Sequence, residues 1–196
     1  RQSPLLLAGP PGLKEFFSCL KNVSHFNVHF PLEIVELGSE SEPLHASGFK
    51  IDAKPLEHRV TCLGYRLQEP PKPGVFDAEK AEALRLPHGP IRGRLQNGET
   101  VEWQGQTISP DELIGPKRPG RVIAYCTDTR PCDNAVTLAE NADVLIHDST
   151  FNDAFTERAR QTYHSTAREA AGVAKTAGAR QLVLWHISTR LLYHEN

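Results

Sequence analysis

The chain has 196 residues and a formal net charge of −2, so it can bury one sizeable core and is not basic as a whole. This charge excludes binding of nucleic acid through a uniformly positive surface, and any such contact would come from local patches. No apolar run is long enough to span a bilayer and no signal peptide is recognisable, so we expect a cytoplasmic protein without a membrane segment.

The first third of the chain contains short apolar runs bounded by turn residues, a pattern that predicts strands. One strand begins at Pro4 and is stopped by the turn Gly9-Pro-Pro-Gly12. A helix is expected over residues 13–23, where apolar residues recur at helical spacing. Further strands are expected over residues 28–36, 48–56 and 60–68.

The composition changes at Glu69-Pro-Pro-Lys-Pro-Gly74, and the segment stays rich in Pro and Gly up to Gly120. Within it we expect order only in a helix over residues 77–84 and in a strand pair around Asn97-Gly98 and Gln104-Gly105. An insertion of this length between core strands is usually functional or flexible. The predicted organisation is therefore a core formed by residues 1–68 and 118–196, with residues 69–117 inserted as an arm.

Strand and helix patterns alternate after the insertion, which predicts an α/β fold. Strands are expected over residues 121–126, 143–147 and 181–185, and helices over residues 132–140 and 165–177. The last helix has a capping signal, Ser165-Thr166 followed by Glu169. Right-handed crossovers between such strands place their carboxyl ends at one edge of the sheet.

Chemically active side chains follow three of these strands: His58, Asp128 and His186. Open α/β sheets keep their chemistry at this edge, so the three endings suggest a hydrolytic metal site. Each residue also has a structural interpretation. Asp128 can cap a turn or bridge two cations. His186 can be a satisfied structural histidine, or it can act with the following Ser188 and Arg190 on a phosphate oxygen. His58 is the weakest signal alone.

His164 precedes the helix that starts at Ser165, where it either solvates the helix terminus or handles a proton. The helix dipole disfavours a charged ring there, so a proton donor would need a carboxylate partner, and the sequence indicates no obvious one. Asp148, after His147, is a plausible residue for orienting an imidazole. The four cysteines show no Cys-x-x-Cys pair and are interpreted as reduced thiols rather than ligands.

An ordered set of motifs resembles the tRNase Z (ribonuclease Z) family, the tRNA 3′-processing endonucleases of the metallo-β-lactamase fold. The matching segments, in order along essentially the whole chain, are Leu7-Ala-Gly-Pro-Pro-Gly-Leu-Lys-Glu-Phe16, Pro55-Leu-Glu-His58, Gly64-Tyr-Arg66, Lys72-Pro-Gly74, Leu86-Pro-His-Gly-Pro90, Gly98-Glu-Thr-Val101, Asp128-Thr-Arg-Pro131, Val144-Leu-Ile-His-Asp-Ser-Thr-Phe151, His164-Ser-Thr166 and His186-Ile-Ser-Thr-Arg190.

The resemblance implies a function for each site residue. His58 and His186 would each bind one of two zinc ions, Asp128 would bridge both, and His164 would handle a proton beside the scissile phosphate. Ser188 and Arg190 would hold phosphate. The arm, with Gly89, Pro90, Arg92 and Arg94, would grip the precursor tRNA, and the protein would be a homodimer.

The family's His-x-His-x-Asp-His motif is absent from these residues and is expected before Arg1. The resemblance thus implies an αββα sandwich that is incomplete at its N-terminus, with an inserted flexible arm. Two alternatives remain open. One is another hydrolase of the same fold acting on a small phosphodiester or a lactam, and the other is a catalytically incomplete chain that binds tRNA.

Overall fold

A computed structural model of the chain describes residues 3–25, 28–39 and 41–189. These residues divide into two compact units. The larger unit runs up to Glu69 and resumes at Arg121, and the smaller unit is Pro70–Gly120. Over the described ranges, no helix is long and apolar enough to cross a membrane.

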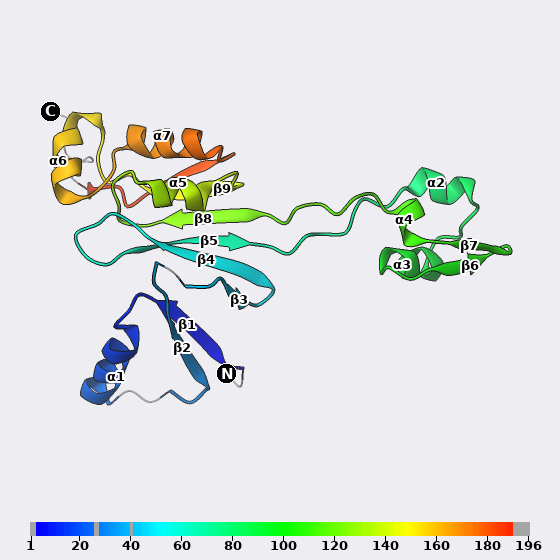
Figure 1. Cartoon of the computed structure of the whole chain (residues 1–196), viewed down its shortest axis with the longest axis horizontal. Coiled ribbons are helices and arrows are strands. Elements are labelled where there is room, and N and C mark those ends of the chain that lie inside the picture. The colour runs from blue at the N-terminus through cyan, green and yellow to red at the C-terminus, as the bar shows by residue number, and fades with distance from the viewer. Residues whose placement is uncertain (1–2, 26–27, 40, 190–196) are drawn as a thin grey trace. The chain divides into compact units, whose positions relative to one another are not determined.

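The larger unit contains a six-stranded mixed sheet in the order β10-β9-β8-β5-β4-β3 (Figure 1). The bounds of its strands are β3 (Leu44–Ala46), β4 (Phe49–Pro55), β5 (Leu63–Gln68), β8 (Val122–Cys126), β9 (Val144–Asp148) and β10 (Leu182–Trp185). Strands β8, β9 and β10 are parallel to one another, whereas β3, β4, β5 and β8 pair antiparallel. The carboxyl ends of the three parallel strands therefore share one edge of the sheet, as the sequence predicts.

Two helices, α5 (Asp133–Ala139) and α7 (Ala167–Ala177), cover one face of this sheet (Figure 1). Helix α5 packs on β4, β5 and β8, and α7 packs on β9 and β10. Gly64 lets β5 approach α5, because a Cβ atom there would lie 2.6 Å from the Leu138 side chain. The predicted capping box of α7 is present, with Thr166 and Glu169 bonded reciprocally. The core between helices and sheet is small and aliphatic, and its fully buried members include Ala124, Ala135, Leu138 and Leu145.

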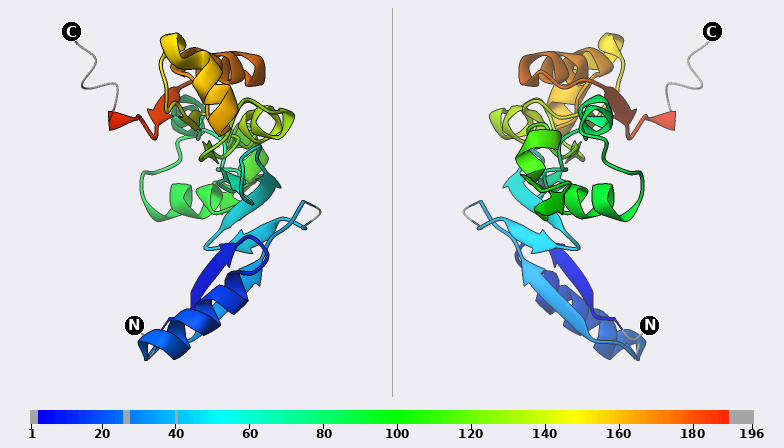
Figure 2. Two further views of the ribbon diagram at one scale, coloured as in Figure 1. Left: turned by 90° about the vertical axis from the view of Figure 1, so that its left-hand side faces the viewer. Right: turned by 90° about the vertical axis from the view of Figure 1, so that its right-hand side faces the viewer.

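The start of the chain forms a separate parallel pair, β1 (Leu5–Gly9) and β2 (Leu32–Glu36), with α1 (Leu13–Ser24) along it (Figure 2). The Glu36 carboxylate accepts hydrogen bonds from the Gly12 and Lys14 N–H groups, which satisfies donors at the start of α1. The helix is confirmed, but none of its residues is buried, and Phe16 is 65% exposed.

Several predicted boundaries in the larger unit are wrong. The strand expected from residue 28 begins at Leu32, and the one expected from residue 60 begins at Leu63. Strand β3 was not predicted because it has only three residues. The segment between β9 and α7, for which no element was predicted, contains η1 (Asp153–Phe155) and α6 (Thr156–Thr162). Helix α6 is polar and buries only Ala159, so it offers no apolar periodicity to detect.

The smaller unit is more ordered than its composition suggests. Its elements are α2 (Ala78–Ala83), α3 (Pro90–Gln96), β6 (Val101–Trp103), β7 (Gln106–Ile108) and α4 (Pro110–Leu113). The hairpin between β6 and β7 turns at Gln104 and Gly105, which have φ angles of 49° and 77°, as a two-residue type I′ turn requires. The expectation of only two ordered pieces is therefore wrong. This unit has an apolar core of its own, formed by Ala81, Leu86, Leu95, Val101, Ile108 and Leu113.

The two ends of the smaller unit run side by side. Lys72 and Arg118 exchange backbone hydrogen bonds of 2.9 Å in each direction, and Gly115 N donates to Val75 O at 3.0 Å. The backbones approach so closely that a Cβ atom on Gly74 would lie 1.8 Å from Gly115 O. Glycine is thus required at position 74 by this approach. The Pro- and Gly-rich ends of the insertion are therefore paired with each other through backbone hydrogen bonds.

Candidate metal centre

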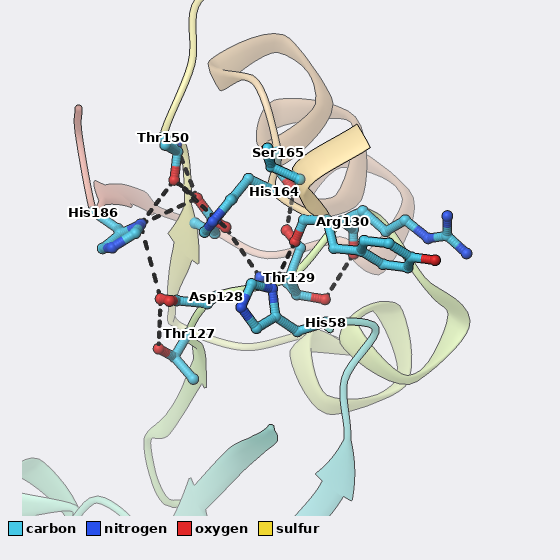
Figure 3. Close-up of polar contacts among 12 residues, drawn as sticks. His58, Thr127, Asp128, Thr129, Arg130, Thr150, His164, Ser165 and His186 are labelled. Atoms are coloured by element: carbon cyan, nitrogen blue, oxygen red, sulfur yellow. Dashed lines mark hydrogen bonds and ion pairs between the residues drawn. The ribbon is translucent and has the colours of Figure 1, made fainter. Parts of the chain in front are cut away.

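Polar side chains from separate elements meet at the carboxyl-terminal edge of the sheet (Figure 3). Asp148 is the last residue of β9, while Asp128 and His186 follow β8 and β10. His58 lies between β4 and β5, and His164 lies between α6 and α7. The sequence predicts that His58, Asp128 and His186 follow strands. The fold brings Asp148 and His164 to the same edge of the sheet.

The side chains form two overlapping groups that could each hold a metal ion. One is His58, Asp128 and His164, and the other is Asp148, His164 and His186, with the ligand atoms of each group within 4.8 Å of one another. His164 belongs to both groups. The structure therefore brings together all three residues predicted as metal ligands and the residue predicted to handle a proton.

Asp148 organises the site although its side chain is fully buried. Its Oδ2 accepts from His164 Nδ1 at 2.7 Å and from Thr129 N at 3.0 Å. Its Oδ1 accepts from Thr150 N at 2.8 Å and from Thr150 Oγ1 at 2.6 Å. Both oxygens of this buried carboxylate therefore have hydrogen-bond partners, as a buried polar group requires.

The expectation that His164 has no obvious carboxylate partner in this chain is wrong, because that partner is Asp148. The two residues are separated by η1 and α6, and no local pattern in the sequence connects them. The available signal was the position of Asp148 at the end of a parallel strand, on the same edge as the other candidates.

His186 contacts a hydroxyl that the sequence analysis did not single out. Its Nδ1 lies 2.8 Å from Thr150 Oγ1, and only 3.8 Å and 3.9 Å from the nearest oxygens of Asp128 and Asp148. The residue adopts a left-handed backbone conformation with φ of 60°. Such a conformation is unfavourable for a residue other than glycine, and it is often retained at functional sites.

His58 is held by the loop before His164. Its Nδ1 lies 3.0 Å from the backbone oxygen of Tyr163, which has φ of 61° at the end of α6. Arg130 stacks on the Tyr163 ring at 4.7 Å and pairs with the Glu57 carboxylate at 2.5 Å. Arg130 thus connects the residue before His58 and the residue before His164 to the segment that follows Asp128. The weakest sequence signal thus belongs to a well-anchored side chain.

Of the two predicted phosphate ligands, Ser188 lies within the described residues. Ser188 N donates to Thr150 O at 3.1 Å, so the backbone of this segment is fixed beside the site. Arg190 lies outside the described residues. The predicted phosphate contacts of both residues stay predictions.

Two side chains beside the site, Cys62 and His147, are kept in their neutral forms mainly by burial. Burial raises the pKa of the Cys62 thiol, and the negative charges of Asp128 and Asp148 raise it further. Burial also lowers the pKa of His147, whose Nδ1 lies 2.8 Å from Asp148 O. Its Nε2 is buried and has no hydrogen-bond partner among the described residues. His147 is thus a neutral ring that packs behind the site and holds the backbone of Asp148.

The residues predicted to contact tRNA lie in the smaller unit, at the start of α3 and within it. Gly89 has φ of 107° and Pro90 occupies the first turn of the helix. Arg94 is exposed and pairs with Glu99 at 2.8 Å. Arg92, in contrast, is buried, and its guanidinium donates two hydrogen bonds to Leu86 O. The side chain of Arg92 therefore stabilises the fold of this unit, and we assign it no phosphate contact.

The donor set fits a zinc ion. Zinc in proteins is held by imidazole nitrogen and carboxylate oxygen, and both kinds of donor converge here. A ligating histidine normally donates its second ring N–H to a carbonyl or carboxylate. Of the histidines predicted as ligands, His58 has such an acceptor in Tyr163 O, and His186 Nδ1 lies 2.8 Å from the Thr150 hydroxyl.

Comparisons with known proteins agree with this geometry. The family described as "Beta-lactamase superfamily domain" matches residues 75–187. The chain is 43% identical over 190 residues to the ribonuclease Z of Methanosarcina acetivorans, which covers 97% of this chain and 62% of that protein. It is 44% identical over 191 residues to the ribonuclease Z of Myxococcus xanthus, again covering 97% of this chain and 62% of that protein.

A solved structure shows the same fold. The short form of human tRNase Z superimposes with a TM-score of 0.61 at 22% sequence identity, covering 96% of this chain and 62% of that chain. These findings confirm the resemblance inferred from the ordered motifs and the expected fold class. The chain spans about 62% of the length of the two curated relatives.

Proposed function

The chain belongs to the β-lactamase superfamily, and on that basis we propose that the full-length protein is a zinc-dependent endoribonuclease that removes the 3′ trailer from precursor tRNA. One observation carries the proposal: a chain similar along nearly its whole length to ribonuclease Z proteins places an imidazole and carboxylate cluster at one sheet edge. A second feature supports it, because the chain between β5 and β8 is interrupted by a compact unit that has an apolar core of its own.

The chain's own residues divide the chemistry among them. His58, Asp128 and His186 would contribute to holding two zinc ions, with Asp128 between them. Bound zinc would polarise the phosphate and provide a water nucleophile at neutral pH. Ser188 and Arg190 would hold the phosphate oxygens and stabilise the charge that grows on them.

His164 has the position and the partner of a proton donor. When water attacks phosphorus and the bond to the 3′ oxygen of the tRNA breaks, that oxygen needs a proton. His164 Nδ1 is held by Asp148 at 2.7 Å, which fixes the orientation of the ring. Nε2 would then deliver the proton. The products would be a tRNA with a 3′ hydroxyl and a trailer with a 5′ phosphate.

The inserted unit is proposed to bind tRNA, and the full-length protein to act as a homodimer. The unit has no net charge, since its seven basic residues are matched by seven acidic ones. Contacts with phosphate would therefore depend on where the basic side chains lie. The exposed ones are Lys72, Lys80, Arg85, Arg94, Lys117 and Arg118.

The test is cleavage of a 3′-extended precursor tRNA by the full-length zinc-loaded protein, with both product ends mapped. A mature tRNA without a trailer and a small phosphodiester serve as comparison substrates. We expect one cut at the tRNA 3′ boundary, and much faster turnover of the precursor than of the small diester. Turnover of the small diester without cleavage of the precursor would instead support another hydrolase of this fold, and binding without any hydrolysis would support an incomplete enzyme.

A further inference from the structure

Thr150 Oγ1 contacts three side chains of the site at once. It lies 2.6 Å from Asp148 Oδ1, 2.8 Å from His186 Nδ1 and 3.1 Å from His164 Nδ1. We propose that Thr150 is a positioning residue that keeps the proton of His186 on Nδ1, so that Nε2 of His186 stays available to a metal ion. This inference rests on the proposed function only in assigning a metal ion to the site.

The hydrogen bonds around Asp148 determine which atoms of the site carry protons. Its Oδ2 accepts from His164 Nδ1 and Thr129 N, and its Oδ1 accepts from Thr150 N. An ionised carboxylate has no proton to give, so the hydrogen of the short contact with Thr150 must come from the hydroxyl. The distance of 2.6 Å is that of an O–H donor on a charged oxygen.

A threonine hydroxyl has a single hydrogen, and Asp148 takes it. Thr150 Oγ1 can then only accept further hydrogen bonds, through its lone pairs. His186 Nδ1 lies at 2.8 Å, so this nitrogen must carry a hydrogen and donate it. In a neutral ring, the second nitrogen is then unprotonated and free to bind a cation.

No other contact of comparable length sets the tautomer of His186 within the described residues. Its Nδ1 is 3.8 Å from Asp128 and 3.9 Å from Asp148, which is beyond hydrogen-bond range. The side chain is 43% exposed, and its ring stacks on the His164 ring with centroids 5.2 Å apart, a contact that does not determine which nitrogen carries the hydrogen. Thr150 is well suited to hold it, because it is buried and its backbone is bonded on both sides, to Asp148 Oδ1 and to Ser188 N.

The other two histidines provide internal controls. His164 Nδ1 keeps Asp148 Oδ2 as an acceptor when the Thr150 hydroxyl is removed, and His58 Nδ1 keeps Tyr163 O. Removal of the hydroxyl should therefore release the tautomer of His186 alone. A general loosening of the site would affect all three rings.

The experiment compares Thr150→Val, which removes the hydroxyl at nearly constant volume, with Thr150→Ser, which retains it. Nitrogen-15 NMR of the histidine rings is recorded on the metal-free full-length protein at a pH where they are neutral. We expect Nδ1–H at His58, His164 and His186 in the wild type and in Thr150→Ser. In Thr150→Val, His186 should become a mixture of tautomers or change to Nε2–H, while the other two rings stay unchanged.

Zinc affinity, measured by competition with a chelator, is the second readout. Loss of a residue that orients a ligand typically weakens metal binding by about 10- to 100-fold, and we expect a loss of that size in Thr150→Val and recovery to within about threefold in Thr150→Ser. The proposal is overturned if His186 keeps Nδ1–H in Thr150→Val, or if all three rings change together. The NMR result does not depend on the substrate, so a wild type that fails to cleave precursor tRNA contradicts the proposed function and not this inference.

Discussion

The Asp148 carboxylate illustrates how a buried charge can be stabilised by the fold that surrounds it. Four hydrogen bonds from three residues reach its two oxygens, and two of the donors are backbone amides. Amides are fixed by the strand ends and cannot leave the carboxylate when substrate enters. Because its own position is fixed, Asp148 holds the His164 ring in one orientation.

Replacing His164 by alanine should separate proton transfer from metal binding. We expect the His164→Ala protein to retain its zinc and to lose turnover of precursor tRNA by about 100-fold or more, the usual contribution of a positioned proton donor. Zinc content is measured by elemental analysis beside the cleavage assay. His164 is a member of both metal-type groups, so stoichiometric loss of zinc would identify it as a ligand instead.

The cysteines should differ sharply in reactivity. Burial raises the pKa of Cys126 to about 12, whereas Cys19 is exposed. The thiolate is the reactive form, so iodoacetamide at pH 8 should modify Cys19 and leave Cys126 unmodified in the folded protein. Mass spectrometry of tryptic peptides measures both sites, with the denatured protein as the control. Equal labelling of the two in the native state would show that the core around β8 is open.

The raised pKa of Cys126 also has a defined effect on stability. The folded state disfavours the thiolate, so the contribution of this thiol is complete below its ordinary value of 9.0 and is lost as pH rises from there towards about 12. Cys126→Ala should therefore reduce the loss of unfolding free energy between pH 8 and 10. Denaturant titrations at both pH values measure the difference, and identical pH dependence in the two proteins would contradict the assignment.

The stability of the inserted unit is expected to depend on the buried side chain of Arg92. Its guanidinium is buried and donates twice to Leu86 O, so Arg92→Ala should leave a buried carbonyl without a partner and lower the stability of the unit by about 1.5–3 kcal/mol. Arg94→Ala is the matched control, since an exposed ion pair contributes about 1 kcal/mol at most.

Fluorescence of Trp103, in a Trp185→Phe background, follows unfolding of this unit. If Arg92→Ala unfolds at the same denaturant concentration as Arg94→Ala, the buried hydrogen bonds do not stabilise the unit.

Removal of the whole inserted unit tests whether it binds tRNA. Glu69 N donates to Arg121 O at 2.9 Å, so these residues are adjacent, and a short Gly/Ser linker can replace residues 70–120. We expect the shortened full-length protein to fold and to hydrolyse a small phosphodiester, but to bind precursor tRNA more weakly and with a shallower dependence on salt. Filter-binding titrations over a range of salt measure both. Unchanged affinity together with an unchanged salt slope would show that the unit has another purpose.

For the whole molecule, the sequence predicted most of the strands and helices of the larger unit and the edge at which they end. Those predictions depended on local patterns, such as the apolar run before Asp128 and the capping signal at Thr166. The contacts that make the site depend on long-range geometry. Thr150 follows β9 and carries no recognisable signal in the sequence. It contacts His164 and His186 because α6 and β10 end close to it in the fold.

The inserted unit shows the opposite limitation. Its many Pro and Gly residues suggested little order. They instead lie in turns and in the paired ends of the unit, which has a small apolar core. The helices are only four to seven residues long, too short for apolar periodicity to be recognised. The resemblance implied that Arg92 belongs to the surface that grips tRNA, and its burial and hydrogen bonds to Leu86 O could be found only from the structure.

Asp128, which follows β8, is proposed to hold the metal ions with which the full-length protein would cut precursor tRNA. The most direct measurement is zinc content and precursor tRNA cleavage, determined side by side on the wild type and on Asp128→Ala. We predict that the wild type binds two zinc ions and releases the trailer, and that the variant loses cleavage and most of its zinc, because a bridging ligand serves both ions. Near-normal cleavage by Asp128→Ala with unchanged zinc content would contradict the account.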